Sequence, residues 1–208
     1  MDSGGPMNVF ELDHLVVAAR TLDQGLDWCE ATLGVRPSAG GQHVFMGTHN
    51  RVLDISSAQF ARTYLEIIAI DPSLPAPPHA RWFDLDDAAL QRELIDTPRL
   101  VHWVARVADI DAACAAQRAA GIDCGVVTRA ERGALRWRIT LRADGRRMDG
   151  GASPALIRWD GPHPTDAMAA SPVRLASFSS APQPLAAALV TPRGRVELNA
   201  PAAHSIGA

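Results

Sequence analysis

A duplicated pattern of elements is the feature of this sequence that most constrains its fold. Residues 10–37 and 100–124 each open with an apolar stretch of strand length, continue into a capped amphipathic helix and end near a glycine. His14 precedes the glycine of the first copy by 20 residues, and His102 precedes that of the second by 19 residues. Both histidines fall in the middle of an opening strand, so we expect them to occupy equivalent positions in two similar units.

Strand-like segments broken by turns follow each predicted helix, around 44–46, 52–56 and 64–70, and then around 124–128, 134–141 and 155–159. The sequence therefore predicts a β-α-β-β-β unit that occurs twice in an α+β protein. The predicted division is a first unit over 8–71, a linker with a short helix near 87–95 over 72–98, a second unit over 99–162 and a C-terminal extension over 163–208.

The extension has a different amino-acid composition from the two units. Residues 161–208 hold seven of the 15 prolines, which is typical of a loose segment. Within it we predict a strand at 173–178, a short helix near 184–190 and a last strand at 195–198.

The composition restricts the chemistry of any site. All 20 basic residues are arginine, so the chain offers no amine for a pyridoxal phosphate Schiff base and no lysine for a nucleotide-binding P-loop. The net charge of −3 and the scattered arginines give no basic stripe, so we expect no nucleic-acid partner. No apolar run approaches the roughly 18 residues of a membrane span, and the first residues lack a signal-peptide pattern. We therefore expect a cytoplasmic protein without a membrane partner.

Polar residues interrupt the predicted apolar strand faces. Strand alternation embeds His14 and Glu66 in two such faces of the first half, and His102 in one of the second half. The repeat pairs His14 with His102, and Glu66 with a position near Arg158. The predicted faces are Phe10, Leu12, His14 and Val16; Tyr64, Glu66, Ile68 and Ile70; Leu100, His102 and Val104; and Leu156, Arg158 and Asp160.

The duplicated unit resembles the vicinal oxygen chelate superfamily, and within it the glyoxalase-like domain group. Segments 12–16, 47–50 and 64–71 carry the likeness, segments 81–83 and 157–160 fit it, and it covers about residues 8–164. The resemblance implies a curved mixed sheet of the glyoxalase and bleomycin-resistance kind, with a small-molecule pocket between the two units. The superfamily includes lactoylglutathione lyases, extradiol dioxygenases, epimerases and resistance proteins that bind drugs.

In the metal-using relatives, strands of paired units surround one divalent ion. The resemblance carries these positions onto His14, Glu66 and His102, with a fourth at or next to Arg158. Two imidazoles and a carboxylate leave coordination positions open for a substrate, but arginine cannot bind a cation. Two alternatives stay open. Either Arg158 holds a substrate carboxylate while the three ligands bind iron, manganese, nickel or zinc, or Arg158 forms a buried ion pair with Glu66 in the place of the metal.

These alternatives predict different functions. The first is a metal-dependent lyase, isomerase or dioxygenase acting on a small oxygenated, anionic metabolite, with Glu66 as ligand and, when displaced, catalytic base. The second is a metal-free protein that binds or sequesters a small molecule. A third is a dimeric scaffold that pairs edge strands through 193–198, and a homodimer stays open in each case. The predicted substrate-binding residues are His49, Asn50, Arg81, Trp82 and Arg158.

Overall fold

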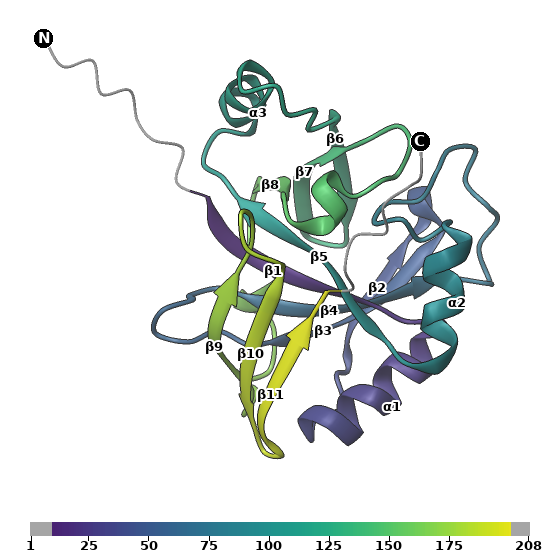
Figure 1. Cartoon of the computed structure of the whole chain (residues 1–208), viewed down its shortest axis with the longest axis vertical. Coiled ribbons are helices and arrows are strands. Elements are labelled where there is room, and N and C mark those ends of the chain that lie inside the picture. Colours follow the sequence, from purple (N-terminus) through teal and green to yellow (C-terminus); the bar gives the residue numbers. More distant parts are fainter. Residues whose placement is uncertain (1–9, 201–208) are drawn as a thin grey trace, which may run out of the picture.

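The computed structural model describes residues 10–200, and its elements follow the predicted duplicated order (Figure 1). Residues 8 and 9 of the predicted first unit and 201–208 of the predicted extension lie outside the described residues. The first β-α-β-β-β unit contains β1 (Glu11–Ala18), α1 (Leu22–Leu33), β2 (Ala39–His43), β3 (Thr48–Asp54) and β4 (Tyr64–Ile70). The second contains β5 (Arg99–Arg106), α3 (Ile110–Ala119), β6 (Val126–Arg132), β7 (Leu135–Leu141) and β8 (Ala155–Trp159). The linker helix is α2 (Ala88–Asp96).

Local sequence signals set the limits of the two unit helices. Thr21 accepts a hydrogen bond from the backbone of α1, and Asp109 accepts two from the backbone of α3. Gly34 (φ 74°) and Gly121 (φ 80°) take the left-handed conformation just after each helix, as their positions in the sequence predict. The strand predicted around 44–46 is wrong. These residues form a short 3-10 helix that ends at Gly47, whose φ of 59° turns the chain into β3.

Eight strands form one mixed sheet in the order β2-β3-β4-β1-β5-β8-β7-β6. The two opening strands, β1 and β5, lie antiparallel at its centre, while β1 pairs in parallel with β4 and β5 in parallel with β8. Arg132, at the end of β6, hydrogen-bonds to Asn50 of β3, so the two outer ends of the sheet approach each other. The sheet is therefore curved and nearly closed around an inner face, which confirms the predicted fold class.

Each face of the sheet has its own apolar cluster. The outer cluster joins the sheet to α1, α3 and the C-terminal strands, with Leu15, Ile67, Ile110, Leu156 and Leu189 fully buried. The inner cluster contains linker residues Trp82, Phe83, Leu85, Leu90 and Leu94 together with Val16, Ile68, Val104, Trp137 and Ile157. The linker thus does more than connect the units, because its aromatic residues fill part of the space inside the curved sheet.

The extension forms a second, three-stranded antiparallel sheet of β9 (Arg174–Ser179), β10 (Ala186–Thr191) and β11 (Gly194–Asn199) (Figure 1). The helix predicted near 184–190 is wrong, because Leu185, Ala187 and Leu189 pack into the outer cluster with the period of a strand, whereas the equally buried Ala188 is not part of that cluster. The expectation of a loose segment is wrong for the same reason.

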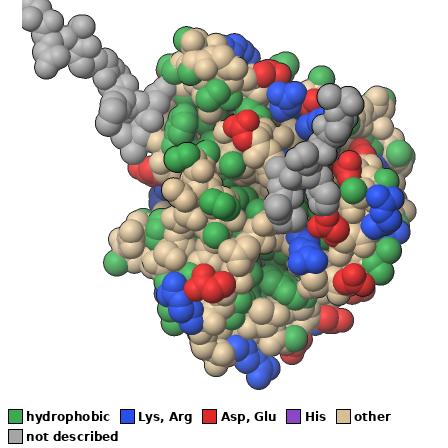
Figure 2. All heavy atoms as spheres, in the orientation of Figure 1, with side chains coloured by type: hydrophobic (Ala, Val, Ile, Leu, Met, Phe, Trp, Pro, Cys, Tyr) green, Lys and Arg blue, Asp and Glu red, His purple; other side chains and the backbone are tan. Residues whose placement is uncertain are grey.

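The surface carries no extended patch of one charge on the face seen in Figure 2, where blue and red side chains are interspersed. Within residues 10–200, no helix has both the length and the apolar character needed to cross a bilayer.

Candidate functional site

His14 and Glu66 face each other on the inner side of the sheet. The parallel pairing of β1 with β4 sets Val16 opposite Glu66, which puts His14 and Glu66 on the same face. The Nε2 atom of His14 lies 3.7 Å from Oε2 of Glu66, and both side chains are almost fully buried. The predicted face of Tyr64, Glu66 and Ile68 is confirmed, since Leu65, Ile67 and Ala69 pack in the outer cluster.

A bulge at Asp13 orients the ring of His14. The register of β1 with β5 shifts between Leu12 and His14, so Asp13 is an extra residue in β1. The expectation that Leu12 shares a face with His14 is therefore wrong, and Leu12 packs in the outer cluster. The fully buried carboxylate of Asp13 has Oδ1 2.7 Å from Nδ1 of His14. A carboxylate accepts this bond from an N–H, so Nδ1 carries a proton and Nε2 is the nitrogen that faces Glu66.

The second oxygen of Asp13 is shared by three more groups. It accepts a hydrogen bond from Nε1 of Trp159 at 3.0 Å, and it lies 3.1 Å from Nε2 of His163 and 3.4 Å from the guanidinium of Arg106. Because Nδ1 of His163 accepts from the backbone of the short 3-10 helix Pro164–Asp166, its Nε2 carries the proton donated to Asp13. Burial alone raises the pKa of Asp13, but the hydrogen bonds from His14 and His163 outweigh it and hold this pKa far below its ordinary value.

A chain of polar contacts continues from Glu66 across the cavity. The amide nitrogen of Asn50 donates to Oε1 of Glu66 at 2.6 Å, and its oxygen accepts from Arg132 at 3.1 Å and from the Gly41 backbone at 3.0 Å. Arg132 also lies 3.2 Å from Nε2 of His43. The side chain of Asn50 therefore connects a buried carboxylate of the first unit with a cation of the second.

Arg132 is a cation without a carboxylate partner. Among residues 10–200 it forms no ion pair, and its hydrogen-bond contacts are to the neutral amide of Asn50 and the ring of His43. Burial, together with the nearby charge of Arg132, lowers the pKa of His43 to about 3, so this ring is neutral near pH 7. Within the described residues, the site therefore keeps a positive charge outside any direct ion pair, beside its acid–base groups.

These side chains line what we call the inner cavity, whose walls include Tyr64, Trp82, Phe83, Trp137, Ile157 and Trp159. Its free space is about 30 Å³, enough for one or two water molecules. Tyr64 stacks on His14 with ring centroids 4.5 Å apart. Burial and the charges of Asp13 and Glu66 raise the pKa of Tyr64, so its hydroxyl stays protonated.

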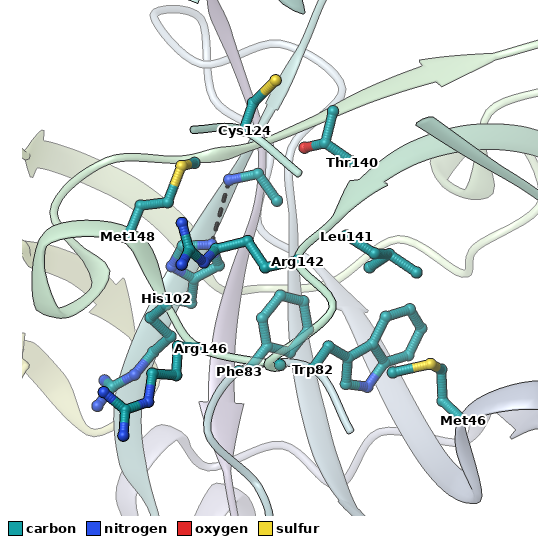
Figure 3. Close-up of a pocket in the computed structure, with 13 residues that line it drawn as sticks. Met46, Trp82, Phe83, His102, Cys124, Thr140, Leu141, Arg142, Arg146 and Met148 are labelled. Carbon is teal, nitrogen blue, oxygen red and sulfur yellow. Dashed lines mark hydrogen bonds between the residues drawn. The ribbon is translucent and has the colours of Figure 1, made fainter. Parts of the chain in front are cut away.

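His102 lies outside the inner cavity. It lines a separate far cavity, also of about 30 Å³, together with Phe83, Thr140, Arg142, Arg146 and Met148 (Figure 3). Its Nε2 accepts a hydrogen bond from the backbone of Ala155 at 3.1 Å, the contact drawn in Figure 3. Burial, with the charge of Arg147 adding to it, lowers the pKa of His102 to about 3.

The internal repeat identifies the second-unit counterpart of Glu66. Glu66 lies opposite Val16, two residues after His14, and Ala155 lies opposite Val104, two residues after His102. The counterpart of Glu66 is thus Ala155, and the predicted position at or next to Arg158 is wrong. An alanine cannot bind a metal ion.

The residues present do not fit the metal site that the resemblance implies. His14 and Glu66 converge, but the Nε2 lone pair of His102 is taken by a backbone N–H and the fourth position is a methyl group. The unpaired guanidinium of Arg132 beside Asn50 also opposes a cation. No group of three or more His, Cys, Asp or Glu side chains within residues 10–200 is placed to hold a metal ion.

Three of the predicted substrate-binding residues do not line the inner cavity. Arg158 is on the outer face with Leu156, is 42% exposed and contacts Asp160 at 3.5 Å, so the predicted pair with Glu66 is wrong. His49 precedes Asn50 on a strand, so the two face opposite sides, and His49 lies 3.4 Å from Asp71. Arg81 pairs with Asp86 at 2.6 Å. The other two, Asn50 and Trp82, do line the inner cavity.

Four residues of the site were not predicted from the sequence: Asp13, His43, Arg132 and His163. Asp13 precedes His14, and an acidic residue beside a strand histidine is a signal that could have been used. His43 falls just before a short helix that was predicted as a strand. Arg132 is 82 residues from its partner Asn50 in the sequence, and His163 is 150 residues from its partner Asp13. No local pattern therefore indicates them.

One family profile and several solved structures are similar to most of this chain. The profile of the family described as "Glyoxalase-like domain" matches residues 12–191. No curated protein sequence matches the chain. Among solved structures, methylmalonyl-CoA epimerase from Mycobacterium tuberculosis is 19% identical, with a TM-score of 0.43, over 76% of this chain and 92% of that one.

Two further structures give similar values. A variant of the Streptomyces coelicolor epimerase in complex with 2-nitronate-propionyl-CoA is 19% identical, with a TM-score of 0.41, over 72% of this chain and 95% of that one. A hypothetical protein from Bacillus halodurans is 14% identical, with a TM-score of 0.40, over 72% and 93%. At these identities the likeness concerns the fold alone.

Proposed function

This chain belongs to the glyoxalase-like domain family, and on that premise we propose that it binds a small, oxygen-rich anion in the inner cavity and moves a proton on it without a metal ion. The observation that carries the proposal is the unpaired guanidinium of Arg132 in the same cavity as the His14–Glu66 pair. A cation held by neutral acceptors can exchange one of them for a ligand carboxylate or enolate and gain a charge-assisted hydrogen bond.

The proton transfer follows from the orientation of His14. Its Nε2 lone pair is directed to the cavity by Asp13, as in sites where a carboxylate fixes the tautomer of a catalytic base. A ligand with a C–H bond beside a carbonyl would lose that proton to His14 or Glu66, and the electron pair would move to the carbonyl oxygen. Arg132 would stabilise the resulting negative oxygen, and return of the proton to the other side of the carbon would complete an isomerisation.

A binding protein without catalysis is the second candidate. The small free volume of the inner cavity favours it, because a ligand must displace side chains to enter. Both candidates require Arg132, but only the first requires His14 and Glu66 to exchange protons with the ligand.

Binding of simple carboxylates tests the anion site. Pyruvate, lactate and malonate, titrated calorimetrically against chelator-treated protein, should bind, while uncharged propanediol should not. Arg132→Gln should weaken binding by about tenfold or more. Arg158→Gln is the matched control and should leave binding unchanged. Equal affinities in the two variants would contradict the proposal.

Proton exchange separates the two candidates. If the protein is an enzyme, the methyl proton signal of pyruvate or the methylene proton signal of malonate should disappear in deuterated water. This loss should be faster with the protein than without it. Glu66→Gln should slow this exchange while Arg132-dependent binding persists. Binding without any accelerated exchange would leave the second candidate.

A further inference from the structure

The inner and far cavities are counterparts in the internal repeat. The inner cavity is built on His14 and Glu66, and the far cavity on their equivalents His102 and Ala155. The duplicated fold therefore contains two copies of one site, of which only the first has a carboxylate. The second copy has the histidine, whose ring is neutral and whose Nε2 accepts a hydrogen bond from the backbone of Ala155.

Two stacked aromatic rings separate the cavities. Trp82 and Phe83 line both of them, with ring centroids 5.3 Å apart and planes inclined by 14°. Trp82 touches His43 on the inner side, with centroids 4.9 Å apart, and Phe83 touches His102 on the far side, at 5.1 Å. Figure 3 shows both rings at the boundary of the far cavity. We call this pair the partition.

The backbone of the partition is strained. Phe83 and the next residue, Asp84, both have a φ of 58°, a left-handed conformation that is rare for residues with a side chain and most unfavourable for bulky ones. Three hydrogen bonds of Asp84 maintain it: its carboxylate accepts from the Arg147 side chain at 2.7 Å and from the Arg147 backbone at 3.0 Å, and its backbone N–H donates to the Gly145 carbonyl at 3.0 Å. Movement of the segment would release this strain.

The far cavity also has an arginine that takes part in no ion pair of residues 10–200. Three arginines line it, of which Arg142 pairs with Asp123 and Asp144, and Arg147 with Asp84. The guanidinium of Arg146, an exposed residue, has no ion-pair or hydrogen-bond partner within residues 10–200, although its charge acts on the carboxylates of Asp87 and Asp144. In the neutral ring of His102 the proton sits on Nδ1, because Nε2 is an acceptor, and this N–H is near the Gly151 carbonyl but forms no hydrogen bond of normal geometry within residues 10–200. Both groups are donors, so this cavity suits a ligand oxygen.

We infer that the partition is displaceable and that the two cavities are halves of one ligand site, which takes a molecule with a flat apolar middle and an anionic group at each end. One end binds at Arg132 and the other at Arg146, while the apolar middle replaces the rings of Trp82 and Phe83. This inference rests on the proposed function for the Arg132 end and adds the substrate class.

Two probes distinguish the ends. Benzoate has one carboxylate and benzene-1,4-dicarboxylate has two on the same ring. By calorimetry, Arg146→Gln should weaken dicarboxylate binding by about tenfold and leave benzoate unchanged, whereas Arg132→Gln should weaken both. Arg195→Gln, on the distant β11, is the matched control. If Arg146→Gln behaves like this control with the dicarboxylate, the inference is overturned while the Arg132 site stands. If Arg132→Gln also has no effect, the proposed function fails as well.

Substitution of Phe83 tests the partition. Phe83→Gly removes one of the two rings and suits the left-handed backbone, so the dicarboxylate should bind about tenfold more tightly because only the Trp82 ring must then be displaced. Phe83→Asn keeps a side chain that tolerates this backbone and guards against loss of folding, which near-ultraviolet circular dichroism would detect. Unchanged or weaker dicarboxylate binding in a folded variant overturns the inference, as does absence of binding to both wild type and variants.

Hydrogen exchange gives a readout independent of affinity. The Asp84 amide, protected by its bond to the Gly145 carbonyl, should exchange faster when the wild-type protein is saturated with the dicarboxylate, and not with benzoate. Equal or greater protection with the dicarboxylate would show that the partition stays in place and would overturn the inference.

Discussion

The carboxylate of Asp13 lies 2.7 Å from Nδ1 of His14 and determines which nitrogen of that ring faces Glu66. The bond exists because Asp13 is the extra residue of a bulge in β1. Its side chain therefore does not follow the regular alternation of side chains along the strand. The same carboxylate anchors Trp159 and His163. One buried charge thus holds together the base of the candidate site and two residues from the other end of the chain.

Asp13→Asn should change both the tautomer of His14 and the stability of the fold. An amide NH₂ facing Nδ1 would donate to it and shift the ring proton to Nε2, which would be visible in ¹⁵N NMR of the imidazole. Loss of the shared charge should lower the free energy of unfolding by about 2–4 kcal/mol in urea. Asp27→Asn, at an exposed carboxylate of α1, is the control and should do neither. An unshifted His14 tautomer in the folded Asp13 variant would contradict the assigned role.

Acid should destabilise the protein through His43 and His102. The ordinary pKa of histidine is 6.5, and burial lowers the pKa of each to about 3. Between these values the unfolded chain binds protons that the folded chain does not, so stability is lost as pH falls from 6.5 toward 3. The loss is up to about 1.4 kcal/mol per pH unit for each histidine. The lowered pKa of Asp13 acts in the same direction, but only as pH approaches its ordinary value of 3.8.

Urea unfolding at pH 6.5, 5.5 and 4.5 measures this slope above the range where Asp13 matters. His102→Gln keeps an acceptor for the Ala155 backbone but cannot take up a proton, so its slope should be smaller by up to about 1.4 kcal/mol per pH unit. Identical slopes in wild type and variant would show that His102 is not held neutral.

Close packing of α1 on β4 depends on Gly25. A Cβ built there would lie 2.4 Å from the side chain of Ile67, which is too close for any contact. Gly25→Ala should therefore lower stability by about 1–3 kcal/mol, despite the higher helix propensity of alanine. Gly161→Ala, where a Cβ meets no atom within 4 Å, is the control and should be neutral. A stabilised Gly25→Ala variant in thermal melts would mean that the helix sits farther from the sheet.

Arg158→Glu tests the placement of the last strand of the second unit. On the sequence alone, this change would supply a fourth metal ligand. In the structure the side chain at 158 is on the outer face, so the variant should take up no more metal than wild type. Increased uptake that depends on both His14 and Glu66 would contradict the observed register of β8.

The repeat could be predicted from sequence because strands, caps and terminal glycines are local features, and the same holds for the face that carries Glu66. Bulges could not. A single extra residue at Asp13 moved Leu12 to the other face, and the register shift between His102 and Leu100 has the same effect in β5. The counterpart of Glu66 was misplaced because loops of different length separate the strands of the two units. Arg132 and His163 were missed because their contacts depend on closure of the whole sheet.

Metal uptake tests the central claim, that His14 and Glu66 belong to an anion-binding acid–base site. Chelator-treated protein would be dialysed in turn against manganese, ferrous iron, nickel and zinc ions, and its bound metal measured by mass spectrometry. We predict far less than one ion per chain, with no difference between wild type and Glu66→Gln. Close to one ion per chain that is lost in both His14→Ala and Glu66→Gln would contradict the account.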